Sequence, residues 1–166
     1  MMLILTVLTF TAGPGDFDFL LGKRWQVHNR VLIERLVGAE EWTEFEAVLD
    51  EVRPIANGLG NVDRFTADWN GPFEGNSIRL YDPRTERWAI WWVDSRNPEL
   101  RFQVEGRFEN GRGEFFGEEV YRGRAVKMRF LWKDITSTSA TWEQAYLDEG
   151  TREWETNWIM TFTRIP

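Results

Sequence analysis

The chain has one histidine, and His28 is its only side chain that ordinarily titrates near neutral pH. If residues 25–36 form a strand, Gln26, His28 and Arg30 share one face, because side chains two positions apart point to the same side. On an inner face, His28 could orient a ligand or transfer a proton beside Arg30. The alternative is a partly exposed strand histidine without a chemical role.

A second polar group lies near the C-terminus. Glu143 and Gln144 are adjacent between aromatic residues, so one of the two must point inward if the sheet closes. An inward Glu143 facing Arg129 would form a buried ion pair, which often marks a functional site. An outward Glu143 paired with a neighbouring strand is the alternative. Asn157 could offer its amide to a ligand carbonyl or simply link strands.

Aromatic residues are the third candidate group: the chain has ten Trp, 12 Phe and 3 Tyr. Such rings are common in cores, at interfaces and around apolar ligands. Trp91 and Trp92 are adjacent and must face opposite sides of a strand, so one of them points outward, where it could cover a dimer contact. The predicted ligand-binding residues are Trp25, His28, Arg30, Trp92, Arg129, Trp132, Glu143, Asn157 and Trp158.

The segments that carry these residues alternate with a period of two, which is typical of strands. A Glu-rich stretch at 40–53 would also suit a helix, but Thr43, Phe45 and Val48 and the following Pro54 favour a strand. Residues 16–22, after Gly13-Pro14-Gly15, indicate one short helical turn. Predicted hairpins join 76–81 to 88–93, 101–108 to 113–118, 119–121 to 125–132, and 139–146 to 154–163.

Together these segments predict an all-β fold, because no long amphipathic helix follows residue 55. Successive antiparallel strands with short connections can remove their exposed edges by closing on themselves. We therefore expect an antiparallel up-and-down β-barrel of about eight to ten strands, preceded by a short N-terminal helical turn.

Several stretches resemble the calycin superfamily. Residues 17–22 followed by Trp25 look like its short helix and Gly-x-Trp, although Gly22-Lys23-Arg24-Trp25 is one residue longer. Residues 91–96, 106–113 and 154–158 are similar to a family of uncharacterised bacterial lipocalin-like domains. The resemblance implies a calycin or lipocalin-like barrel with a cup for a small, mainly apolar molecule.

Nitrobindin, a relative in the same superfamily, carries haem through a histidine near its C-terminus. The only histidine in this chain is His28, in the first predicted strand, so the matching ligand is missing. With one His and no Cys, a catalytic zinc site built on two or three His ligands is excluded by count. We therefore predict no cofactor and no metal.

Charge and the N-terminus bear on partners and location. Twenty Lys and Arg against 27 Asp and Glu give a net charge of −7, which disfavours nucleic acid and anionic membrane surfaces as partners. The apolar residues 1–10 are too few to span a bilayer. Residues 1–15 are thus interpreted as a possible weak export signal or an extra strand, and residues 16–166 as one domain. The cytoplasm is the expected compartment, with export left open.

Three functional hypotheses follow. The first is binding of a small apolar or aromatic molecule inside the barrel, which requires a cavity of roughly 300 Å³ or more. The second is an isomerase, cyclase or hydrolyase in which Glu143, His28 and Arg129 converge in one pocket. The third is a structural or interaction module with an exposed aromatic patch, for which a homodimer is one option.

Overall fold

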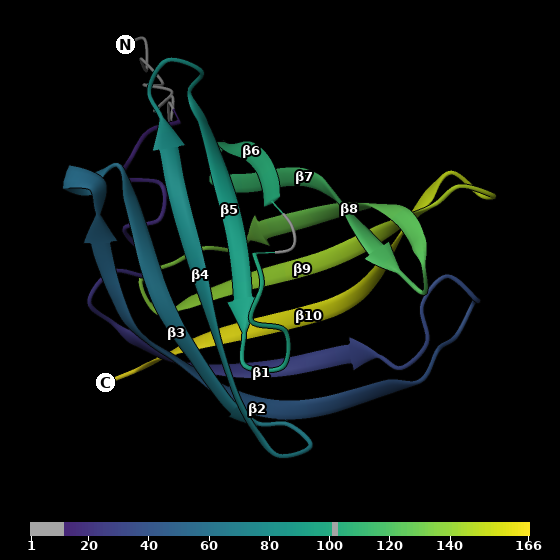
Figure 1. Ribbon diagram of the computed structural model, residues 1–166. Coiled ribbons are helices and arrows are strands. Elements are labelled where there is room, and N and C mark those ends of the chain that lie inside the picture. The colour runs from purple at the N-terminus through teal and green to yellow at the C-terminus, as the bar shows by residue number, and fades with distance from the viewer. Residues whose placement is uncertain (1–11, 101–102) are drawn as a thin grey trace, which may run out of the picture.

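Ten antiparallel strands close into a barrel in a computed structural model that describes residues 12–100 and 103–166 (Figure 1). Each strand pairs with its neighbours in the chain, and β1 pairs with β10 to close the barrel. The predicted up-and-down barrel is confirmed. The strands are β1 (Arg24–Leu32), β2 (Trp42–Ile55), β3 (Gly60–Asp68), β4 (Pro72–Asp82), β5 (Arg87–Asp94), β6 (Gln103–Glu109), β7 (Arg112–Tyr121), β8 (Arg124–Lys133), β9 (Ser139–Asp148) and β10 (Glu153–Ile165).

Helical structure is minimal in the described part of the chain. One 3-10 turn, η1 (Ala56–Gly58), follows β2, and no described helix is long and apolar enough to cross a membrane. The helical turn predicted at residues 16–22 is instead a series of turns with i to i+3 hydrogen bonds, ending at Gly22 with φ of 65°. The apolar run at residues 1–10, interpreted as part of an export signal or an extra strand, lies outside the described residues.

Strand alternation decides which side chains enter the barrel. In β1, Trp25, Val27 and Asn29 are buried, whereas Gln26, His28 and Arg30 lie between them on the outer face. The same alternation in β8, β9 and β10 directs Trp132, Trp142 and Trp158 to the interior. The core is therefore the lumen of the barrel, filled largely by aromatic rings.

The N-terminal turns close one end of the barrel. The Phe17 ring meets the rings of Trp88 at 4.9 Å and Phe108 at 5.0 Å, both in edge-to-face geometry. Asp16 supports this plug, because its Oδ2 accepts hydrogen bonds from the Trp88 indole and the Gly13 amide, each at 3.0 Å. Burial raises the pKa of Asp16, although both hydrogen bonds act in the opposite direction.

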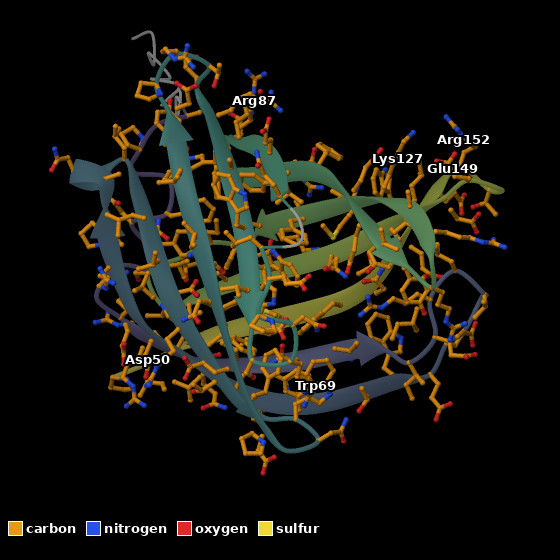
Figure 2. All side chains as sticks on the ribbon, viewed as in Figure 1. Asp50, Trp69, Arg87, Lys127, Glu149 and Arg152 are labelled. Atoms are coloured by element: carbon orange, nitrogen blue, oxygen red, sulfur yellow. The ribbon has the colours of Figure 1, made fainter. Side chains whose placement is uncertain are left out.

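The opposite end forms a mouth between connecting loops. Figure 1 shows the β1–β2 loop and the β7–β8 and β9–β10 turns together at the right of the view. Arg122 and Glu34 link two of these loops at 3.1 Å. In Figure 2, Lys127, Glu149 and Arg152 gather on the outside of the same end, with ion-pair distances of 3.7 and 3.2 Å to Glu149. Surface pairs of this kind contribute little to stability.

Candidate functional site

An apolar cavity lies inside the barrel between the N-terminal plug and the mouth. Its volume is about 80 Å³. This falls short of the roughly 300 Å³ that the binding hypothesis required, so that requirement is not met, and a ligand of the cavity can be no larger than about one ring. Aromatic side chains dominate the lining, in particular Trp92, Trp132, Trp142, Trp158, Phe130 and Phe162.

These rings hold one another in place. Trp142 packs against Phe130 at 4.8 Å and against Trp158 at 6.1 Å, and Trp132 meets Phe162 at 5.1 Å. Aromatic contacts of this type contribute beyond the area that they bury. The cavity wall is therefore a packed aromatic cage supplied by consecutive strands β8, β9 and β10.

Trp92 enters the cavity from β5 because the neighbouring strand carries a glycine opposite its ring. A Cβ on Gly75 would lie 2.1 Å from Cζ2 of Trp92, so only glycine lets the indole rest against β4. The indole nitrogen donates to Asp94 Oδ2 at 3.0 Å. Gly75 and Asp94 thus fix the ring that separates the cavity from the mouth.

A second, more polar pocket of about 150 Å³ lies at the mouth. It shares Trp92, Gln144 and Trp158 with the interior cavity, so the two spaces are neighbours across these side chains. Arg35 and Glu119 are among its charged residues. The interior lining is thus largely apolar, and its entrance is charged.

The β1–β2 loop is tied over this entrance. Arg35 Nη1 donates to the Tyr146 hydroxyl at 2.8 Å, and its guanidinium lies over the Tyr146 and Tyr121 rings at 5.2 and 5.8 Å. The Tyr146 hydroxyl donates to Glu119 at 2.5 Å. Burial, with the Glu119 charge beside it, raises the pKa of Tyr146 well above its ordinary value. A tyrosine hydroxyl is protonated at neutral pH, so it can donate this hydrogen bond, and the raised pKa extends that state to higher pH.

The wall supplied by β3 and β4 contains a buried ion pair. Arg79 donates from Nη2 to Asp63 Oδ2 at 2.5 Å and from Nη1 to Asn61 Oδ1 at 2.8 Å. The side chains of Arg79 and Asp63 are 4% and 0% exposed. The other Asp63 oxygen accepts from the Ser77 amide at 2.8 Å. Removing one member of such a pair leaves a buried charge and is strongly destabilising.

Buried amides lie beside the aromatic cage. Gln144 donates to Asn157 Oδ1 at 2.9 Å, and the Trp158 indole donates to Asn29 Oδ1 at 3.0 Å. The β9–β10 register shifts between Thr156 and Trp158, and this bulge lets Asn157 and Trp158 both be directed away from solvent. Of the adjacent Glu143 and Gln144, the inward residue is Gln144.

The structure brings together part of the predicted binding set. Trp92, Trp132 and Trp158 line the cavity. Asn157 does not line it, but accepts a hydrogen bond from Gln144, which does. Trp25 is fully buried against Phe162 in the core and is not among the cavity-lining residues. Trp91 alternates with Trp92 and is directed outward, where a dimer contact stays a prediction.

The four predicted charged or titratable residues lie on the outer face instead. His28 contacts Glu46 at 2.6 Å, Arg30 contacts Glu44 at 3.2 Å, and Glu143 pairs with Lys133 at 2.5 Å. The Arg129 guanidinium lies over the Trp154 ring at 5.2 Å. Strand alternation explains this placement, because each residue is adjacent to an inward aromatic or apolar neighbour.

The isomerase hypothesis required that His28, Glu143 and Arg129 converge in one pocket. They lie on the outer face and do not converge. Gln26, His28 and Glu46 form a polar cluster on the outer surface. Within this cluster, the hydrogen bonds from Gln26 and His28 lower the pKa of Glu46. This placement does not support the isomerase, cyclase or hydrolyase hypothesis.

Sequence reasoning missed Arg79, Ser77 and Asp63. In β4, Ile78 and Leu80 suggest the inner face by hydrophobicity, yet Ser77 and Arg79 occupy it. The available signal was the parity of Phe73 and Tyr81, two aromatic residues in phase with Arg79.

Within residues 12–100 and 103–166, no group of three or more His, Asp or Glu side chains is placed to hold a metal ion. No protein-family model matches the chain, and no curated protein matches it significantly.

Proposed function

We propose that this protein binds a small, mainly apolar or aromatic molecule, with its ring in the aromatic cage behind the charged mouth. The observation that carries this proposal is the apolar cavity lined by four tryptophans and adjoining a polar pocket. The small volume of the cavity restricts the bound molecule to about one ring. Residues 16–166 would act as one binding domain.

We also propose that the barrel is calycin-like. The closed ten-strand meander and the N-terminal plug that leads into Trp25 support this assignment. Fold likeness does not identify a ligand, so the function rests on the cavity and its lining.

Toluene is a suitable probe of the interior, because it has one ring and no polar group. We expect its addition to ¹⁵N-labelled protein to shift the indole signals of Trp132, Trp142 and Trp158 with saturable dependence on concentration. Leu49→Phe places a ring in the cavity that Leu49 lines and should abolish these shifts. Leu147→Phe, a half-buried position of β9 that is not among the lining residues, is the matched control and should retain them.

The proposal fails if toluene leaves the indole signals of the cage unchanged in the wild-type protein. It also fails if Leu49→Phe, while still folded by circular dichroism, responds to toluene as the wild type does.

A further inference from the structure

Arg79 presents a hydrogen-bond donor that the protein itself does not use. The residue is 4% exposed and lines the interior cavity. Both terminal nitrogens are engaged, by Asp63 and Asn61. Its Nε–H, in contrast, is buried and has no hydrogen-bond partner in the part of the chain that the structure describes.

An unsatisfied buried donor is costly, because the hydrogen bond it made to water in the unfolded chain is not replaced. Here that donor belongs to a residue on the wall of a cavity. Ser77, two positions earlier on β4, lines the same cavity and brings a hydroxyl to this wall. A bound molecule with an acceptor atom near Arg79 would complete the hydrogen bonding.

Charge decides which acceptor fits. Asp63 is fully buried and lies 2.5 Å from Arg79, so the pair has no net charge. A ligand carboxylate would add a second negative charge beside Asp63 in a water-poor interior, with no further cation to balance it among the lining residues of the cavity. An uncharged oxygen accepts the Nε–H hydrogen bond without that penalty.

On the basis of the proposed function, we infer that the ligand carries an uncharged carbonyl oxygen, which accepts a hydrogen bond from Arg79 Nε while its ring lies among the cage tryptophans. Arg79 is then a specificity-determining residue. The ligand class is that of small aromatic or cyclic ketones, aldehydes and esters.

Three probes of nearly equal shape test this inference. Acetophenone, α-methylstyrene and benzoate place a carbonyl, a methylene carbon and a carboxylate at the same position of one ring. In calorimetric titrations of the wild-type protein, we expect acetophenone to bind about tenfold more tightly than α-methylstyrene, and benzoate to bind most weakly.

Arg79→Lys keeps a positive charge opposite Asp63 and removes the Nε–H donor. We expect it to lose the preference for acetophenone and to retain affinity for α-methylstyrene. Arg64→Lys is the matched control, because Arg64 of β3 pairs with Asp50 on the outer face, and it should keep the wild-type preference. The comparison of probes on the wild-type protein stands even if Arg79→Lys does not fold.

Each contrary result has a distinct meaning. Equal binding of ketone and alkene, tightest binding of benzoate, or a folded Arg79→Lys that still prefers the ketone would overturn the inference and leave the interior site intact. If none of the three probes binds, the proposed function falls and the inference with it.

Discussion

Strand alternation separates the polar side chains into two groups, one directed into the barrel and one on its outer face. Inward polar residues such as Arg79 and Asn157 are buried and form hydrogen bonds within the wall, whereas His28 and Arg30 pair with glutamates on the surface. Only the first group contacts the cavity or its immediate border. Residue type alone is therefore a poor guide to the binding site. His28 has a more reactive side chain than Arg79 or Asn157, but it lies on the outer face, away from the cavity.

Replacing His28 tests this division directly. We expect His28→Ala to lower the free energy of unfolding by no more than about 1 kcal/mol, because the Glu46 partner is exposed. Its affinity for toluene should equal that of the wild type in the same titration. A loss of toluene binding in a folded His28→Ala protein would place His28 in the site and contradict the account.

Asp16 gives a pH-dependent prediction. Because burial raises the pKa of Asp16, folding favours its protonated form. The contribution of this group to stability is then greatest below about pH 4 and falls as pH rises through the folded-state pKa. Asp16→Asn stays uncharged, so the stability of the variant relative to wild type should be higher at pH 7 than at about pH 4.

Urea unfolding at both pH values measures this difference. Asp68→Asn, an exposed position at the end of β3, is the control and should show no such trend. A constant difference between Asp16→Asn and wild type at the two pH values would refute the effect.

At the scale of elements, the sequence was sufficient for most hairpins because their turns carry strong signals, such as Asn110-Gly111 between β6 and β7. Strand β3 was missed because Asn61 and Asp63 occupy its inward positions, so it lacks the apolar alternation of a wall strand. The same two residues accept hydrogen bonds from Arg79, which lines the cavity.

Strand β7 shows a different limit. It is continuous over ten residues. The sequence predicted separate strands at 113–118 and 119–121, because Glu118 and Glu119 interrupt the apolar pattern. Glu119 is directed to the mouth, where Tyr146 donates to it. Which residues line a cavity depends on register, and the sequence does not determine register across ten strands.

The pairing of β6 with β7 depends on a close backbone approach at Gly106. A Cβ at this position would lie 1.8 Å from the Glu114 carbonyl oxygen, and the backbone can relieve the clash only by moving. We expect Gly106→Ala to destabilise the protein by about 1–3 kcal/mol in urea unfolding. Gly150→Ala in the β9–β10 turn, where the nearest atom is a side-chain oxygen of Asp148 at 3.2 Å, should cost less than about 0.5 kcal/mol. Equal effects of the two variants would contradict this role of Gly106.

At the scale of the whole molecule, one barrel end is sealed by an aromatic plug and the other is covered by linked loops. A ligand held between these ends binds the folded state only and should stabilise it. At ten times its Kd, toluene should add about 1.4 kcal/mol to the free energy of unfolding, which corresponds to about 3–6 °C in Tm for a domain of this size. The same toluene concentration should leave the Tm of Leu49→Phe unchanged. A similar rise in both proteins would indicate binding outside the cavity.

The central claim is that the interior holds a small ring-shaped molecule, and diffraction from crystals equilibrated with toluene vapour tests it most directly. The account predicts electron density for one ring in the cavity between the indoles of Trp132, Trp142 and Trp158. A lumen filled by side chains, or toluene bound only on the outer surface, would contradict it.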